Sequence, residues 1–208
     1  PPVPLPRRMW AGGRLKFPGV LRVGDRALKR SEVMKVDVKE GRSGKLVFVQ
    51  VNHRIGADDK AAIEEEHDIV YREAPAPGTP APKPAAAPGG AAWTKTIEPD
   101  PVLLFRYSSL TANSHRIHYD WQYVTSEEGY PGLVVHGPLI ATLLLELLRA
   151  HEPARKVETF SFRALSPLFA PDRFTVNGAP AADGRTVKLW AANHQGDLAM
   201  EANATLVA

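Results

Sequence analysis

The chain has 208 residues, of which 44% are hydrophobic and 24% charged, a composition that supports a folded core and excludes a disordered chain. Lysine and arginine outnumber aspartate and glutamate by 26 to 23, a net charge of +3, which by itself does not indicate a nucleic-acid-binding protein. The absence of cysteine excludes disulfide scaffolds, thiolate metal sites and a cysteine nucleophile, and it fits a reducing, cytoplasmic location.

The chain begins with Pro1 rather than methionine, so we expect it to be part of a longer gene product. Prolines and arginines interrupt the apolar residues near this end, and we therefore expect no signal peptide over residues 1–15.

The first half of the chain favours strands. Apolar and polar residues alternate over residues 33–38, residues 41–44 (GRSG) form a turn, and residues 46–55 (LVFVQVNHRI) are typical of a strand. This order predicts a β-hairpin. A further strand is predicted over residues 63–71, and the pattern of a long helix is absent from this half.

A proline-rich segment follows over residues 74–92. It contains six prolines, three glycines and no large apolar side chain, so it cannot bury enough surface to offset the entropy lost on ordering. We predict a semi-rigid linker that separates residues 1–73 from residues 93–208.

The second half contains one plainly helical segment, residues 138–149 (PLIATLLLELLR). Pro138 suits the first turn, and Arg149 and His151 suit the C-terminal end. The segment is apolar nearly all round, which predicts burial, and at roughly 12 residues it is shorter than the roughly 20 needed to span a membrane. Four β-rich runs follow it, which together predict an α+β domain: residues 157–165, 173–178, 186–193 and 198–207.

The densest group of polar residues precedes this helix, over residues 111–120 and 130–138. We predict that His118 is a general acid or base, because imidazole titrates near neutral pH. Asn113 would position a water molecule or the imidazole. The N–H of Gly137, at the start of the buried helix, would stabilise a carbonyl oxygen that gains negative charge. Proton abstraction next to a thioester, or hydration of its unsaturated form, requires these groups.

Each histidine taken singly is more often structural than catalytic, and the three-residue spacing of His115 and His118 does not indicate metal ligation. His136 could merely satisfy backbone groups at the helix start. Arg116 is the best candidate for binding an anion of the substrate, and we place His136 and Tyr130 with it as candidate substrate-binding residues. We predict no metal site.

Residues 111–137 (TANSHRIHYDWQYVTSEEGYPGLVVHG) resemble the hydratase signature of the MaoC-like, hotdog-fold acyl-thioester dehydratases. In that signature an acidic residue and a histidine five positions later precede the His-Gly pair that opens the central helix. The resemblance places His118 at the family histidine and Gly137 at the oxyanion glycine, whereas Asn113 replaces the acidic residue.

The sequences HRIHYD and YPGLVVHG, with residues 4–13 and 41–49, resemble most closely the subgroup of 3-hydroxyacyl-thioester dehydratase type 2 and the mesaconyl-C4-CoA hydratases. The resemblance implies a double hotdog, in which an antiparallel sheet wraps a central helix in each repeat. The first repeat would lack its N-terminal strand and helix here. Two repeats in one chain permit either a self-contained molecule or a homodimer.

The predicted activity is that of a hydro-lyase in fatty acid metabolism. It would add or remove water across the α,β double bond of an acyl-CoA thioester, for which a mesaconyl-type substrate is one candidate. Coenzyme A would be part of the substrate, with no separate cofactor. Two alternatives stay open. A hotdog thioesterase would use a carboxylate such as Asp120, Glu127 or Glu128, and Asn113 would fit a non-catalytic acyl-binding or partner subunit of a heteromeric dehydratase.

Overall fold

The computed structural model describes residues 2–41, 44–57, 59–74 and 83–207. The chain divides into two compact units. Unit 1 comprises Pro1–Lys83, Val157–Arg163 and Ala204–Val207, and unit 2 comprises Pro84–Lys156 and Ala164–Asn203. The predicted boundaries at residues 73 and 93 stay a prediction, and residues 75–82 of the predicted linker lie outside the described residues.

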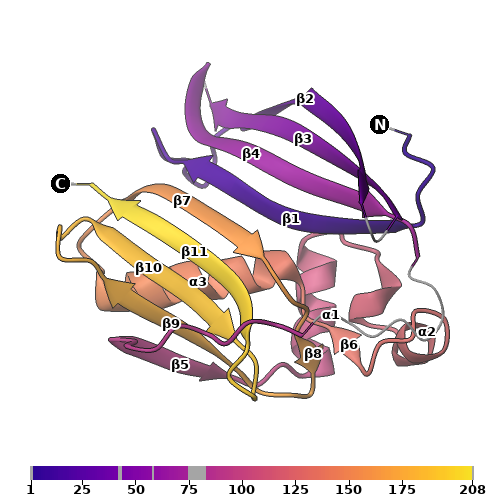
Figure 1. Ribbon diagram of the computed structural model, residues 1–208. Helices are drawn as coiled ribbons and strands as arrows, with labels where there is room; N and C mark the ends of the chain where they lie inside the picture. Colours follow the sequence, from indigo (N-terminus) through magenta and orange to yellow (C-terminus); the bar gives the residue numbers. More distant parts are fainter. Residues whose placement is uncertain (1, 42–43, 58, 75–82, 208) are drawn as a thin grey trace. The chain divides into compact units, whose positions relative to one another are not determined.

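Unit 1 is an antiparallel sheet in the strand order β2-β3-β4-β1-β7 (Figure 1). Its strands are β1 (Arg7–Lys16), β2 (Leu28–Gly41), β3 (Gly44–Ala57), β4 (Lys60–Arg72) and β7 (Val157–Ala164). The described residues of the first 73 contain no helix, as the sequence pattern predicted.

The predicted hairpin is present in unit 1. Strands β2 and β3 pair along their length with Gly41 opposite Gly44, although residues 42–43 of the predicted turn lie outside the described residues. Strand β4 confirms the strand predicted over residues 63–71. One face of these strands buries Val47, Val49 and Ile69, so alternation of period two orients the apolar side chains as expected.

Strand β1 was not predicted, because Gly12 and Gly13 interrupt its apolar pattern. The register with β4 shifts between Trp10 and Gly12, and a Cβ atom at Gly12 would lie 2.6 Å from the carbonyl oxygen of Phe162 on β7. The glycine therefore permits the close approach of two strands, a requirement set by tertiary structure that strand propensity does not reveal.

The main sheet of unit 2 has the order β11-β10-β9-β5. Its strands are β5 (Trp93–Ile97), β9 (Phe174–Pro180), β10 (Thr186–Ala192) and β11 (Leu198–Leu206). The last three coincide with β-rich runs predicted from the sequence. Two short strands, β6 (Leu133–Val134) and β8 (Phe169–Ala170), form a separate antiparallel pair.

Helix α3 (Gly137–His151) confirms the predicted helix and lies against β5, β9 and β10 of unit 2 (Figure 1). Leu144 and Leu148 are fully buried in this contact. The helix is not buried all round, because Thr142 and Glu146 form an exposed stripe. Among the described residues, no helix combines the length and the apolar character needed to cross a bilayer.

Two further helices were not predicted, α1 (Pro101–Leu110) and α2 (Trp121–Ser126). Each begins after an aspartate whose side chain accepts a hydrogen bond from the first turn: Asp100 from the N–H of Leu103 at 2.7 Å, and Asp120 from Tyr123 at 3.0 Å. These N-caps are standard start signals, but neither helix carries a clear apolar stripe, so the pattern alone gives no sign of it.

We expect Leu144→Ala to lower the free energy of unfolding by about 2 to 5 kcal/mol, because the fully buried leucine would leave a cavity between α3 and the sheet. Urea denaturation followed by circular dichroism measures this loss. Glu146→Ala on the exposed stripe is the matched control and should change stability by less than about 0.5 kcal/mol. Equal losses in the two variants would contradict the packing described.

Candidate active site

His118 lies in a single turn of 3₁₀ helix, η1 (Arg116–His118), and is only 7% exposed. Its Nδ1 lies 2.7 Å from the carbonyl oxygen of Val134. Because a carbonyl oxygen only accepts, Nδ1 carries the proton in the neutral ring, and Nε2 keeps a lone pair. Burial lowers the pKa of His118 to about 4, so the side chain is an uncharged base at neutral pH.

The ring of His136 stacks on that of His118, with centroids 3.7 Å apart and planes inclined by 15°. His136 is completely buried, and its Nε2 lies 2.8 Å from the hydroxyl of Ser108 on α1. Burial, and secondarily the proximity of His118, lowers the pKa of His136 to about 3. Its Nδ1 is buried without a hydrogen-bond partner in the described part of the chain. The stack therefore consists of two neutral imidazoles at pH 7.

Buried polar side chains are concentrated at this place. Ser108, His118 and His136 are three of the four polar residues buried within the described chain, the other being Asn177. Burying polar groups costs free energy unless they are hydrogen-bonded, so packing alone does not account for such a cluster. Perturbed titration in a cluster of this kind is typical of a functional site.

The start of α3 follows this histidine stack directly, because His136 is the N-cap residue and Gly137 the first residue of the helix. The side chain of His136 does not cap the helix, and the first turn contains no acidic residue. Pro138 has no N–H, so the backbone donors of the first residues are those of Gly137 and Leu139. A helix start with these donors favours a substrate oxygen that gains negative charge.

Asn113 lies in the turn between α1 and η1. Its side-chain oxygen accepts a hydrogen bond from the backbone N–H of His115 at 3.1 Å. The backbone N–H of Asn113 donates to the carbonyl oxygen of Ser108 at 2.9 Å. The asparagine thereby links the segment that carries His118 to the helix that carries Ser108. Asn113 is predicted to position a water molecule, and its side-chain NH₂ group would do so. This role stays a prediction.

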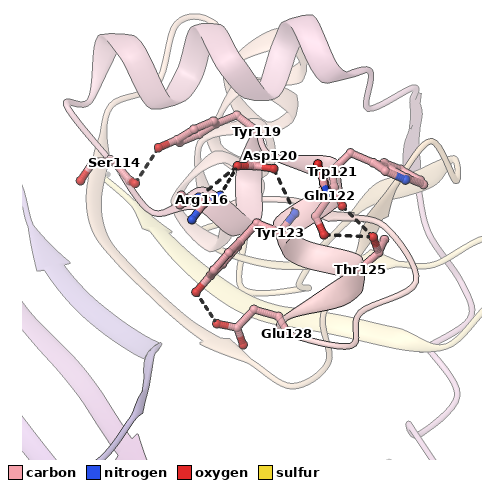
Figure 2. A network of polar contacts seen from close by, with 9 residues as sticks. All are labelled: Ser114, Arg116, Tyr119, Asp120, Trp121, Gln122, Tyr123, Thr125 and Glu128. Carbon is pink, nitrogen blue, oxygen red and sulfur yellow. Dashed lines mark hydrogen bonds and ion pairs between the residues drawn. The ribbon is translucent and has the colours of Figure 1, made fainter.

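Arg116 projects into a polar network beside this turn (Figure 2). Its Nε and Nη2 donate to Asp120 at 3.0 and 2.7 Å, and its guanidinium lies 4.2 Å from the ring centre of Tyr123. The hydroxyl of Tyr123 donates in turn to Glu128 at 3.1 Å. Arg116 is 55% exposed, so its guanidinium is accessible to an anion from solvent although Asp120 already binds it.

The structure brings together only part of the predicted set. His118, His136 and Gly137 meet at the start of α3, whereas Arg116 contacts the Asp120 network and Tyr130 packs toward Phe169 with ring centroids 5.7 Å apart. Sequence reasoning missed Ser108, since a serine inside an unpredicted helix carries no signal of its own.

Comparison with known proteins places the chain in a family. The family model for hydroxyacyl-thioester dehydratase type 2 matches residues 1–170. The chain belongs to this family. The resemblance inferred from residues 111–137 is therefore confirmed.

Two relatives of this dehydratase family are similar along much of the chain. Mesaconyl-C(4)-CoA hydratase from Chloroflexus aurantiacus is 48% identical over 207 residues, which cover 99% of this chain and 72% of the relative. The mitochondrial hydroxyacyl-thioester dehydratase type 2 from Schizosaccharomyces pombe is 30% identical over 158 residues, which cover 74% of this chain and 51% of the relative.

Solved structures confirm the predicted α+β hotdog fold. HtdX from Mycobacterium tuberculosis has a TM-score of 0.73 at 20% identity, covering 95% of this chain and 76% of its own. A MaoC-like dehydratase from Phytophthora capsici has a TM-score of 0.74 at 13% identity, covering 96% of this chain and 72% of its own. At these identities the likeness concerns the fold alone.

We expect the free energy of unfolding to fall as the pH drops from about 6.5 toward 4. The pKa values of His118 and His136 lie below the ordinary 6.5 in the folded chain, so in this window the unfolded chain binds more protons. Each histidine contributes a slope of up to about 1.4 kcal/mol per pH unit, and the stability is complete above the unfolded pKa. Urea denaturation at pH 7, 6 and 5 measures the slope.

The matched variants for this pH dependence are His136→Phe, which keeps an aromatic ring in the stack without a titrating group, and His194→Ala at an exposed histidine. The first should flatten the slope and the second should leave it unchanged. Parallel curves for wild type and His136→Phe would refute the assignment.

Proposed function

We propose that this chain is a hydro-lyase that adds water to, or removes it from, the α,β double bond of an acyl-CoA thioester. The observation that carries the proposal is the neutral His118, fixed through Nδ1 to Val134 and stacked on the residue that precedes Gly137. This arrangement places a proton acceptor beside backbone donors for a carbonyl oxygen. The names of the two relatives, hydratase and dehydratase, support the same reaction class.

In the hydration direction, the Nε2 atom of His118 takes a proton from water as the water oxygen bonds to the β carbon. The electron pair of the double bond moves toward the thioester, whose oxygen becomes enolate-like and accepts a hydrogen bond from the N–H of Gly137. The protonated His118 then returns its proton to the α carbon. Because residue 113 is an amide rather than a carboxyl group, one imidazole performs both proton transfers, and Asn113 positions the water.

Of the three residues predicted to bind substrate, this proposal keeps Arg116 and Tyr130 in that role, whereas the completely buried His136 acts through its stack on His118. A guanidinium has five N–H donors, and Nε and Nη2 of Arg116 both donate to one oxygen of Asp120. A phosphate of coenzyme A or a substrate carboxylate would be a second acceptor. A mesaconyl-type unsaturated dicarboxylyl thioester is the first substrate to test, because the 48% identical relative is named for one.

The proposed hydration uses no redox or metal cofactor, since it requires only a proton carrier and donors for the carbonyl oxygen. Coenzyme A enters as part of the substrate. A cytoplasmic location, a role in fatty acid metabolism, and assembly as a self-contained double hotdog or a homodimer belong to the same proposal.

The carboxylates that a thioesterase would use have other contacts. Asp120 caps α2 and binds Arg116, and Glu128 accepts a hydrogen bond from the hydroxyl of Tyr123. Glu127 is exposed at the C-terminal cap of α2. Release of free thiol from a saturated acyl-CoA would nevertheless favour the thioesterase alternative, and activity that appears only with a partner subunit would favour the non-catalytic one.

We expect His118→Ala to lower kcat by about 10² to 10⁴, the usual contribution of a general acid–base group. The absorbance of the conjugated thioester, followed over a panel of enoyl-CoA substrates, measures the rate. His118→Asn keeps a donor for the Val134 carbonyl without a titrating group and should lose as much. His194→Ala, at the exposed surface, is the matched control. Wild-type turnover in folded His118→Ala would sink the proposal.

The pH profile offers an independent test. Since burial holds the pKa of His118 at about 4, the neutral base persists far below pH 6.5, and kcat/KM for hydration should fall only as the pH drops through about 4. Initial rates between pH 4 and 8 measure this limb, and circular dichroism at each pH verifies that the chain is still folded there. Half-loss of activity near pH 6.5 would contradict a buried His118 as the base.

A further inference from the structure

A second group of histidines lies in unit 1, on neighbouring strands. His53 of β3 stands directly opposite Glu65 of β4, and His67 stands opposite Val51, one step further along the same face. Residues two apart on a strand share a face, so the side chains of His53, Glu65 and His67 converge. The two histidine rings lie edge to face with centroids 5.6 Å apart.

These three groups lie close enough together to reach one metal ion. One nitrogen or oxygen atom from each of His53, Glu65 and His67 lies within 4.8 Å of the other two. The distance from Glu65 Oε1 to His67 Nδ1 is 3.3 Å, long for a charge-assisted hydrogen bond, which is usually about 2.7 to 2.9 Å. Two ligands of a tetrahedral Zn²⁺ ion, each bonded at about 2.0–2.1 Å, stand roughly 3.3–3.4 Å apart.

The surroundings hold these side chains in the form that a metal requires. The hydroxyl of Ser31 lies 2.7 Å from Nδ1 of His53, which orients the ring, as outer partners of metal-bound histidines do. Burial lowers the pKa of His53, and the hydrogen bond to His67 lowers the pKa of Glu65. At neutral pH one ligand is therefore a neutral imidazole and another an ionised carboxylate.

Solvent has access to the group. Ser31, His53 and Glu65 line a cavity of about 830 Å³ within unit 1. The side chains of Glu65 and His67 are 17% and 24% exposed, so both are largely shielded but not sealed. A metal ion held by three side chains here would keep a further position open to water or to an anion.

We propose that His53, Glu65 and His67 bind a divalent transition-metal ion of the zinc class. Two imidazoles and one carboxylate form a donor set suited to zinc. The residues of this site belong to unit 1, whereas His118 belongs to unit 2, and the proposed hydration does not require a metal ion. The inference therefore stands or falls independently of the proposed function.

Isothermal titration of the whole chain with Zn²⁺ at pH 7.5, after treatment with a chelator and its removal, tests the site. We expect one ion per chain, at least tenfold weaker binding for Glu65→Gln and His53→Gln, and roughly 10 to 100-fold weaker binding for Ser31→Ala, which removes only the orienting hydroxyl. His194→Ala is the matched control and should bind as wild type. Circular dichroism verifies that each variant is folded.

Co²⁺ supplies a readout that does not depend on activity. Visible absorption of four-coordinate Co²⁺ should appear in wild type and disappear in Glu65→Gln. Absence of saturable Zn²⁺ binding would overturn the proposal. The proposal would also be overturned if folded Glu65→Gln and His53→Gln bound Zn²⁺ as tightly as wild type. If His115→Ala alone abolished binding, the ion would lie at other histidines, and the proposal would be wrong.

Discussion

The hydrogen bond between Nδ1 of His118 and the carbonyl oxygen of Val134 determines which form of the imidazole the site contains. The strand pair β6–β8 holds that carbonyl group, with Leu133 opposite Ala170 and the N–H of Val135 bonded to Leu168 at 2.8 Å. The backbone segment that fixes the tautomer therefore continues into the start of α3. One segment thus positions both the proposed proton acceptor and the proposed backbone donors.

Burial keeps the two histidines of this site uncharged, and it also costs folding free energy. Placing two imidazoles in a nearly dry environment disfavours their charged forms. Among the described residues, only one ring nitrogen of His136 has a hydrogen-bond partner, the hydroxyl of Ser108. The apolar contact of α3 with the sheet, centred on the fully buried Leu144, offsets such a cost. The fold thus keeps a neutral imidazole in a buried position, which a polar side chain by itself would not favour.

The sequence predicts what short-range patterns encode. The β-rich run of β3 and the apolar run of α3 place these elements within a few residues of their observed ends. Strand β1 escapes prediction because Gly12 serves a close approach to β7. Ser108 escapes because its significance depends on His136, which lies 28 residues away and reaches it only through packing. A family resemblance identifies the His-Gly pair, but it does not supply the burial that lowers the pKa values of His118 and His136.

The group of His53, Glu65 and His67 illustrates the same limit more sharply. These residues follow no metal-binding spacing along the chain, and only the register of β3 against β4 brings them together. A one-residue shift of β3 against β4 would put the side chain of His53 on the opposite face of the sheet from those of Glu65 and His67. The three side chains would then be separated. Such a site is a property of strand pairing, which single-sequence patterns specify poorly.

The two histidine groups share one hydrogen-bonding arrangement and differ in the side chain next to the imidazole. In both, an oxygen atom fixes Nδ1 and leaves Nε2 for chemistry: the Val134 carbonyl for His118, and the Ser31 hydroxyl for His53. His118 faces a neutral stacked ring, which offers a positive charge no compensation, so it suits brief proton transfer. His53 faces the carboxylate of Glu65, which stabilises a resident cation. The neighbouring side chain, more than the imidazole itself, decides which chemistry each group supports.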